Sequence, residues 1–232
     1  MSKRTIAAVL FDFDMTLIDS SYAIADCTNR LARAMGLREV SREEVLGVIG
    51  LPIEDSWIAL WGHSQPEWLD YYRGHFRNVE QDGFREFPGT RSLPTALRAE
   101  GIRTGVVSNR RFARTAVEKC GIAELFDTIV GLEDVTHPKP DPESLFVALD
   151  RLGVAPDRAL YVGDTDIDMK TAAAAGVRGV GMTTGHFRDA ALRAAGAAWT
   201  CGDLREILHL LRQEDGHCET IAEGDEPTKD RG

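Results

Sequence analysis

Residues 9–20 have the sequence Val-Leu-Phe-Asp-Phe-Asp-Met-Thr-Leu-Ile-Asp-Ser, in which an apolar, strand-like run ends in two carboxylates, Asp12 and Asp14. A continuous apolar run is typical of a strand buried in a parallel sheet, and ligands of open α/β sheets collect just beyond the carboxyl ends of such strands. Residues two apart share one face of a strand, so the two carboxylates repel each other unless a cation or a shared proton lies between them. A hard divalent ion such as Mg²⁺ would resolve this conflict. Considered alone, the pair could also be a solvated strand end that leads into a turn.

The chain after Pro88 alternates between strand-like and helix-like segments. We predict strands at 6–11, 102–107, 128–131, 159–162 and 177–181, and helices at 112–120, 143–152 and 169–175. Such alternation is typical of a parallel sheet with helices on both faces. The predicted fold class is therefore α/β, with a Rossmann-like core.

The stretch from 20 to 87 has a different character. Apolar residues recur there at helical spacing, and Gly and Pro divide the run into several helices. We expect an inserted α-helical cap domain at 20–87 and an α/β core domain formed by 1–19 and 88–213. Residues 214–232 are polar, acidic and contain glycine, which is typical of a disordered tail.

The composition restricts location and partners. The 232 residues include 43% hydrophobic and 28% charged residues and carry a formal net charge of -10, as in an ordinary soluble globular protein. The acidic balance argues against nonspecific binding to nucleic acid or to an anionic membrane, since both depend on clustered Lys and Arg. The apolar run at 6–11 is too short for a signal peptide, and no run is long enough to span a bilayer. Four widely spaced cysteines form no Cys-X-X-Cys pair, so we expect reduced thiols in a cytoplasmic protein.

Two further groups of polar residues follow predicted strands or stiff loops. Ser108 and Asn109 lie between a strand and a helix, where a serine is most often a helix N-cap but can also offer its hydroxyl to a phosphate. Lys139 lies between Pro138 and Pro140, which stiffen the backbone and reduce the entropy lost in presenting the ammonium group. A solvated surface lysine is the alternative interpretation of Lys139.

A third group, Gly163-Asp164-Thr165-Asp166-Ile167-Asp168, also follows a predicted strand. If the next helix begins near Thr165, Asp164 stays on the loop at the strand end. Asp166 and Asp168 then lie in the first helical turn, where acids interact favourably with the helix dipole. We expect Asp164 to join Asp12 and Asp14 in a three-carboxylate cluster at one edge of the sheet.

In this order, these segments resemble the four motifs of the haloacid dehalogenase-like superfamily of phosphohydrolases. Residues 12–16 are similar to the first motif, Ser108 to the second, Lys139 to the third and residues 163–168 to the fourth. The helical insertion between the first and second motifs resembles the cap of the subgroup that includes phosphoglycolate phosphatases and β-phosphoglucomutases. Two positions depart from the usual pattern.

These departures are Met15, where the family commonly has Gly, and Arg110, where Lys is frequent after Asn109. Neither removes a group with a chemical role.

The resemblance implies a phosphatase that uses Mg²⁺ and an aspartyl-phosphate intermediate. Asp12 would be the nucleophile, and Asp14 the general acid and base. The Mg²⁺ ion would be held by the side chains of Asp12 and Asp164 and by the backbone carbonyl of Asp14. Asp168 would bind a water molecule on the metal. The same resemblance implies that further residues bind the substrate.

The phosphoryl oxygens would be bound by Ser108, by the backbone of Asn109 and by Lys139. Lys139 is also expected to be a catalytic residue. Thr16 would orient the first loop at the phosphate. The expected partner is a small-molecule phosphate ester, with no nucleic acid or membrane, and the expected state is a monomer or a small homo-oligomer.

The insertion contains Trp57, Trp61 and Trp68, and such an aromatic stripe is usually the core of a helical domain. It could also form a wall suited to a bulky or aromatic leaving group. A sugar-phosphate mutase of the β-phosphoglucomutase type remains an alternative function, as does a noncatalytic phosphate-binding regulatory module. A phosphonate hydrolase is disfavoured because residues 20–87 contain no lysine, and a dehalogenase would not require Asp14 and Asp164.

Overall fold

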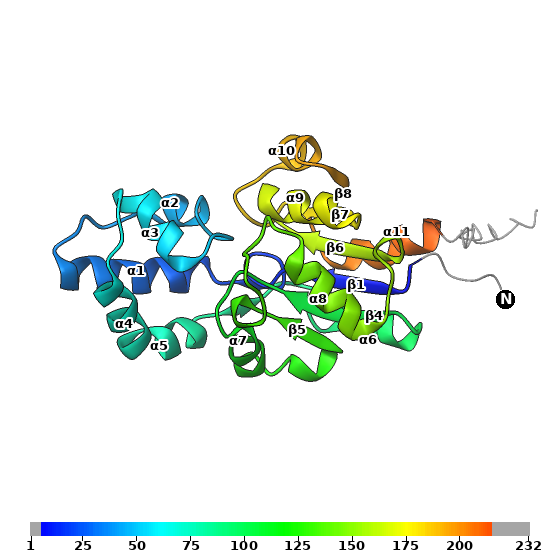
Figure 1. Cartoon of the computed structure of the whole chain (residues 1–232), viewed down its shortest axis with the longest axis horizontal. Coiled ribbons are helices and arrows are strands. Elements are labelled where there is room, and N and C mark those ends of the chain that lie inside the picture. The colour runs from blue at the N-terminus through cyan, green and yellow to red at the C-terminus, as the bar shows by residue number, and fades with distance from the viewer. Residues whose placement is uncertain (1–5, 215–232) are drawn as a thin grey trace, which may run out of the picture.

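The structure, a computed structural model, describes residues 6–214 and is built on a six-stranded parallel sheet (Figure 1). Its order is β5-β4-β1-β6-β7-β8, with β1 in the middle of the motif-bearing strands. The strands are β1 (Ala8–Phe11), β4 (Arg103–Val107), β5 (Thr128–Val130), β6 (Ala159–Gly163), β7 (Arg178–Met182) and β8 (Ala197–Cys201). The predicted α/β class with a Rossmann-like parallel sheet is confirmed.

Alternate residues of β1 point to opposite faces of the sheet and enter two different hydrophobic clusters. Val9 and Phe11 belong to the cluster that includes side chains from α6 (Ser92–Ala99), α7 (Ala113–Lys119) and α11 (Arg205–Glu214). Ala8 and Leu10 belong to the cluster that includes side chains from α8 (Glu143–Leu152) and α9 (Asp166–Ala175). Helices therefore cover both faces, and β1 is buried completely between them.

The remaining elements of the core are short. A helix, α10 (Asp189–Ala194), lies beside β8, and three 3₁₀ turns occur at η1 (Ala123–Leu125), η2 (Leu132–Asp134) and η3 (Pro156–Arg158). Helices α6, α10 and α11 and strand β8 were not among the predicted elements.

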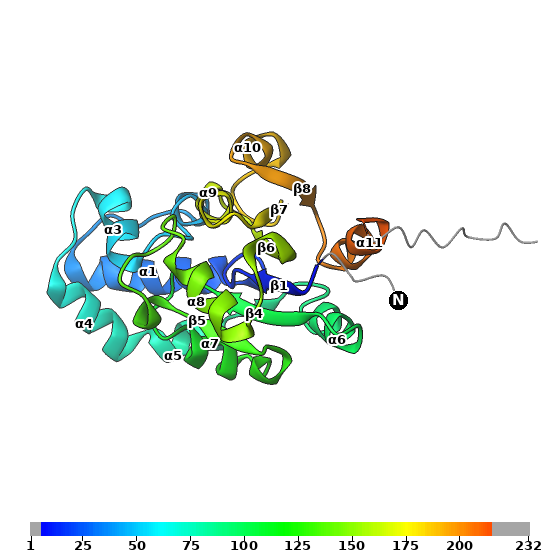
Figure 2. The same ribbon diagram turned by 45° about the vertical axis from the view of Figure 1, so that its right-hand side comes forward.

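Five helices within residues 21–82 form a separate group, which we call the helical insertion. They are α1 (Ser21–Met35), α2 (Arg42–Leu46), α3 (Ile53–Trp61), α4 (Pro66–His75) and α5 (Arg77–Asp82). Figures 1 and 2 both place them at one end of the molecule, beyond the edge of the sheet. Their buried side chains form two clusters of their own, one of which contains Trp57, Trp68 and Tyr72.

A two-stranded antiparallel sheet, β2 (Ile18–Asp19) with β3 (Arg85–Glu86), carries the chain into and out of the helical insertion. Two neighbouring chain segments, β2 and β3, thus connect the insertion to the rest of the fold. Of the predicted tail at 214–232, Glu214 is the last residue of α11. Residues 215–232 lie outside the described part of the chain.

Two smaller predictions can be compared directly. Cys27, Cys120 and Cys201 are free thiols, whereas Cys218 lies outside the described residues. Among residues 6–214, no helix has both the length and the apolar character needed to cross a membrane.

Candidate active site

Three predicted site residues follow neighbouring strands. Phe11 of β1 pairs with Val106 of β4 and with Val162 of β6, so the chain segments after these strands leave the sheet side by side. Asp12, Ser108 and Asp164 are the first polar residues of those segments, and all three are buried. The parallel sheet therefore brings together residues that are far apart in the sequence.

Three buried carboxylates form a cluster at this edge. Oxygen atoms of Asp12, Asp164 and Asp168 lie within 4.8 Å of one another, and none of the three residues is more than 3% exposed. The Thr16 hydroxyl donates a hydrogen bond of 3.2 Å to Oδ1 of Asp164. Hard divalent cations prefer carboxylate oxygens, so this donor set fits Mg²⁺.

Burial disfavours the charged forms of Asp12 and Asp164 and therefore raises the pKa of both carboxyl groups. Desolvation raises the pKa of Asp12 to about 7, against the lowering effect of Lys139 and together with the charges of Asp168 and Asp14. Desolvation, reinforced by Asp168 and Asp12, also raises the pKa of Asp164 well above its usual value. A bound cation would favour the charged forms of both groups and remove this cost.

Lys139 is not a solvated surface lysine but a buried cation among these acids, with 2% exposure. Its ammonium group donates to Oδ1 of Asp12 at 2.8 Å, to Oδ1 of Asp168 at 2.7 Å and to the Tyr161 hydroxyl at 2.8 Å. Burial acts to lower the pKa of Lys139, but the charges of Asp12 and Asp168 outweigh it and hold the pKa above its usual value. Lys139 is therefore a fixed positive charge.

Asp168 is held from two sides. Its Oδ2 accepts hydrogen bonds from the backbone N–H and the hydroxyl of Thr165, the N-cap of α9, while its Oδ1 faces Lys139. The helix thus begins at Asp166, three residues before the predicted range of 169–175 and next to Thr165, the alternative start considered above. A Cβ atom on Gly163 would lie 2.5 Å from the Asp168 side chain, so only glycine allows this approach.

The loop after β4 differs from the prediction in one respect. Helix α7 begins at Ala113, so Ser108 is not a helix N-cap, and its Oγ instead accepts a hydrogen bond of 3.2 Å from the backbone N–H of Arg110. The N-cap interpretation was therefore wrong. The intervening turn passes through Phe112, whose φ of 60° is left-handed.

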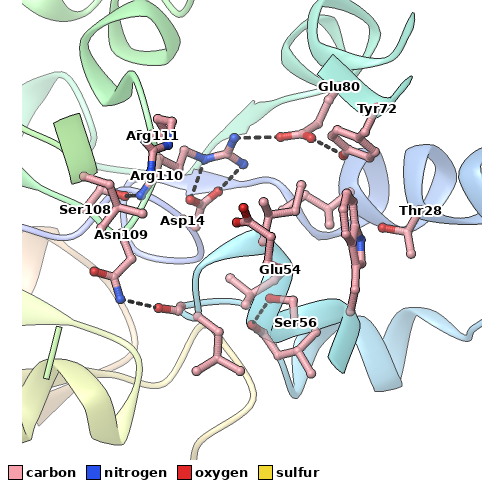
Figure 3. Close-up of a pocket in the computed structure, with 18 of the residues that line it drawn as sticks. Asp14, Thr28, Glu54, Ser56, Tyr72, Glu80, Ser108, Asn109, Arg110 and Arg111 are labelled. Carbon is pink, nitrogen blue, oxygen red and sulfur yellow. Dashed lines mark hydrogen bonds and ion pairs between the residues drawn. The ribbon is translucent and has the colours of Figure 1, made fainter. Parts of the chain in front are cut away.

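The Asn109 side chain joins three segments. Its Oδ1 accepts a hydrogen bond of 2.9 Å from the backbone N–H of Lys139, and its Nδ2 donates to the Lys139 carbonyl at 3.1 Å. The same Nδ2 donates to the carbonyl of Gly50 in the helical insertion at 2.9 Å (Figure 3). Asn109 therefore fixes the Lys139 loop and touches the insertion.

Asp14 lies apart from the three clustered carboxylates. Its carboxylate accepts two hydrogen bonds from Arg110, with Nε at 2.6 Å from Oδ2 and Nη2 at 2.8 Å from Oδ1 (Figure 3). It accepts a third from the Ser20 hydroxyl at 2.6 Å. The structure thus replaces the expected cluster of Asp12, Asp14 and Asp164 side chains by one of Asp12, Asp164 and Asp168. The reason is Arg110, which pairs with the Asp14 side chain.

Met15, the other departure from the family pattern, has a φ of 56°, a left-handed conformation that glycine adopts without strain. Its carbonyl accepts a hydrogen bond from the Thr184 hydroxyl. The loop after β7 therefore supports the first motif. A Cβ atom on Gly185 would come within 1.9 Å of Oδ2 of Asp164, so this loop also approaches the carboxylate cluster closely.

A cavity of about 160 Å³ lies between the sheet edge and the helical insertion, with Asp14 at its core side (Figure 3), and Asp12 also lines it. Its lining from the insertion is mostly apolar and includes Val45, Val48, Ile53, Trp57, Leu60 and Leu69. Its lining from the core includes Ser108, Asn109, Arg110, Arg111, Phe112 and Leu132.

Comparison with known proteins agrees with this geometry. Residues 9–182 match the family model of haloacid dehalogenase-like hydrolases. An N-acetylmuramic acid 6-phosphate phosphatase from Pseudomonas aeruginosa is 31% identical over 81% of this chain and 86% of its own length. A pyrophosphatase, PpaX, from Bacillus velezensis is 29% identical over 90% of this chain and 98% of its own length.

A solved structure from Bacteroides fragilis, described as a haloacid dehalogenase-like hydrolase, is 33% identical with a TM-score of 0.79. It covers 87% of this chain and 99% of its own. The chain therefore belongs to the haloacid dehalogenase-like hydrolase family, and it is a phosphatase.

Proposed function

We propose that the protein hydrolyses a small-molecule phosphate monoester with the help of Mg²⁺, through an aspartyl-phosphate formed on Asp12. The observation that carries the proposal is the buried group of Asp12, Asp164 and Asp168 around the ammonium of Lys139, from which Asp12 reaches the lining of the cavity. Buried acids with a raised pKa in a cleft are typical of catalytic sites.

In the first step, an Oδ atom of Asp12 attacks the phosphorus, and the bond from phosphorus to the alcohol oxygen breaks. The Asp14 carboxyl gives its proton to that oxygen as the alcohol leaves. In the second step, a water molecule gives a proton to the Asp14 carboxylate and attacks the phosphorus, which releases Asp12 and inorganic phosphate. Asp14 is thereby returned to its protonated state.

Mg²⁺ would be held by the carboxylates of Asp12 and Asp164 and by the backbone carbonyl of Asp14, and Asp168 would bind a water molecule on the metal. When bound, the ion supplies positive charge that offsets the repulsion between the Asp12 carboxylate and the phosphate. The contact from Thr16 to Asp164 orients one of these ligands.

The phosphoryl group itself would be bound by Ser108, the backbone of Asn109 and Lys139. Lys139 already contacts the proposed nucleophile, so its charge lies where negative charge moves during transfer. The side-chain bonds of Asn109 to the Lys139 backbone keep these two phosphate ligands in one geometry.

The cavity supports a leaving group that carries a hydrophobic ring. Its volume of about 160 Å³ is close to that of an apolar cavity of about 150 Å³ that accepts benzene. Trp57 and Tyr72 line it, whereas Trp61 and Trp68 pack behind them in the insertion. The tryptophan stripe thus serves mainly as core, and Trp57 alone of its three members also forms the wall of the cavity, together with Tyr72.

We further propose that the core domain comprises 1–19 and 88–213, that residues 20–87 form the cap, and that the enzyme works in the cytoplasm. The cap would shield the phosphoryl group from solvent when a substrate fills the cavity. No contact among residues 6–214 favours a mutase over a phosphatase.

The direct test is a panel of phosphate monoesters assayed for released inorganic phosphate with and without Mg²⁺. The panel would include phenyl phosphate, cyclohexyl phosphate, 2-phosphoglycolate and hexose phosphates. We expect Mg²⁺-dependent release, fastest from the single-ring esters. A clear preference for phosphoglycolate would refute the ring-shaped leaving group, and an isomeric sugar phosphate as product would identify a mutase.

A further inference from the structure

A chain of hydrogen bonds runs from Asp14 into the helical insertion. Arg110 contacts Asp14 through Nε and Nη2, and its remaining nitrogen, Nη1, donates to Oε1 of Glu80 at 2.7 Å. Oε2 of Glu80 in turn accepts a hydrogen bond from the Tyr72 hydroxyl. Figure 3 shows the four side chains in this order, from the sheet edge to helices α5 and α4.

This chain of contacts is shielded from solvent. The side chains of Arg110, Asp14 and Glu80 are 21%, 10% and 7% exposed. The Arg110 guanidinium also lies over the rings of Phe13 and Phe84, at 5.8 and 5.0 Å from their centroids. Ion pairs with little solvent around them are short and directional, unlike pairs on the surface.

Arg110 is a rigid link because its guanidinium is planar. Glu80 holds one corner of that plane, and Asp14 accepts from the opposite edge through both of its oxygens. A displacement or rotation at Glu80 therefore changes the direction in which the Asp14 carboxyl points.

Glu80 belongs to the helical insertion, and Asp14 to the first motif. Glu80 lies in α5, which is followed by Gly83, Phe84 and the return strand β3. A Cβ atom on Gly83 would lie 2.8 Å from that of Ala23 in α1, so the end of α5 is packed tightly onto α1 and would move with the rest of the insertion.

We propose that Glu80 is a positioning residue that acts through Arg110 to set the direction of the Asp14 carboxyl, so that the placement of the helical insertion controls proton transfer to the leaving group. This inference rests on the proposed function, in which Asp14 gives that proton. It assigns to Arg110 a role in orienting Asp14 rather than in binding phosphate.

The test compares two substrates that differ in their need for a proton. An alkyl phosphate such as cyclohexyl phosphate has a poor leaving group that depends on Asp14, whereas 4-nitrophenyl phosphate has a good one that does not. The ratio kcat/KM reports the steps up to release of the alcohol, so it isolates the proton transfer to the leaving group.

We expect Glu80→Gln, which keeps the shape of the side chain but removes its charge, to lower kcat/KM for the alkyl ester about tenfold and that for the aryl ester by less than about twofold. Tyr72→Phe, which removes only the hydroxyl that holds Glu80, should produce a smaller loss of the same selective kind. A general loosening of the fold would lower kcat/KM for both substrates by the same factor.

Asp82→Asn is the matched control. Asp82 lies on the same helix and also pairs with the core, through Lys119 at 2.9 Å, but its side chain is 64% exposed and it has no contact with Arg110 among the described residues. We expect the ratio of alkyl to aryl kcat/KM to stay at the wild-type value.

The possible results separate the two proposals. If Glu80→Gln lowered kcat/KM equally for both substrates, or for neither, the ratio of alkyl to aryl kcat/KM would be unchanged. That result would overturn the role of Glu80, while hydrolysis of both esters by the wild-type enzyme would leave the proposed function standing. An inactive wild-type protein with Mg²⁺ would overturn the proposed function and this inference with it.

Discussion

The ammonium nitrogen of Lys139 lies 2.8 Å from Oδ1 of Asp12, and both side chains are almost completely buried. A second acid, Asp168, approaches the same nitrogen at 2.7 Å. Lys139 thus neutralises part of a carboxylate cluster that would otherwise repel itself. The same lysine would be free to contact a phosphoryl group once a metal ion takes over this task.

Lys139→Met should therefore reduce both stability and activity. Removal of the cation leaves buried carboxylates without their partner, and a broken buried ion pair costs about 3–5 kcal/mol. The free energy of unfolding, measured by urea titration, should fall by about that amount, and phosphatase activity should be lost. Lys119→Met, which removes an exposed ion pair to Asp82, should cost less than about 1 kcal/mol.

Mg²⁺ should stabilise the protein more strongly as the pH rises. In the metal-free protein, folding raises the pKa of Asp12 from 3.8 to about 7, so the folded state holds a proton that the unfolded state releases. The contribution of Asp12 to the free energy of unfolding is then largest below about pH 4 and is lost as the pH rises to about 7. Above this range the carboxylate is charged, and the ion binds without displacing a proton.

The melting temperature with Mg²⁺ and with a chelator provides the measurement. We expect the increase on adding Mg²⁺ to be larger at pH 8 than at pH 5.5. An equal increase at both values would show that Asp12 does not take part in metal binding.

Gly185→Ala should abolish activity with little effect on the rest of the fold. The new methyl group would lie within 1.9 Å of Oδ2 of Asp164, so this carboxylate must leave its position. We expect loss of turnover and of Mg²⁺-induced stabilisation. Gly74→Ala in α4, where no atom lies within 4 Å of the added Cβ, should keep full activity and gain up to about 1 kcal/mol of stability.

The positions of Asp12, Ser108 and Asp164 could be predicted from the sequence. Parallel strands end at the same edge, so polar residues that directly follow apolar runs meet there whatever their separation along the chain. The start of α9 was also predictable, because Thr165 followed three residues later by Asp168 is a capping signal.

Other contributors could not be predicted, because their roles depend on tertiary contacts alone. Tyr161 is one apolar-looking member of a buried strand, yet its hydroxyl meets Lys139. Glu80 has the sequence context of a solvated helical residue, yet it is 5% exposed and bound to Arg110. Gly185 becomes informative only when the neighbouring Asp164 is known.

The missed elements have a local explanation. Helix α6 has a proline, Pro94, within its first turn, and β8 has partly exposed residues around Trp199 instead of a continuous apolar run. Edge strands and short amphipathic helices give weaker periodicity than central strands. The predicted N-cap role of Ser108 was wrong because four residues, Asn109 to Phe112, intervene before α7.

The most direct test of the account is to identify the residue that is phosphorylated during turnover. Enzyme mixed with 4-nitrophenyl phosphate and Mg²⁺ would be quenched in acid, digested and analysed by mass spectrometry. We predict one phosphoryl group on Asp12 in the wild-type protein, and neither a phosphoryl group nor turnover in Asp12→Asn. A phosphoryl group on another residue, or continued hydrolysis by Asp12→Asn, would contradict the assignment of Asp12 as the nucleophile.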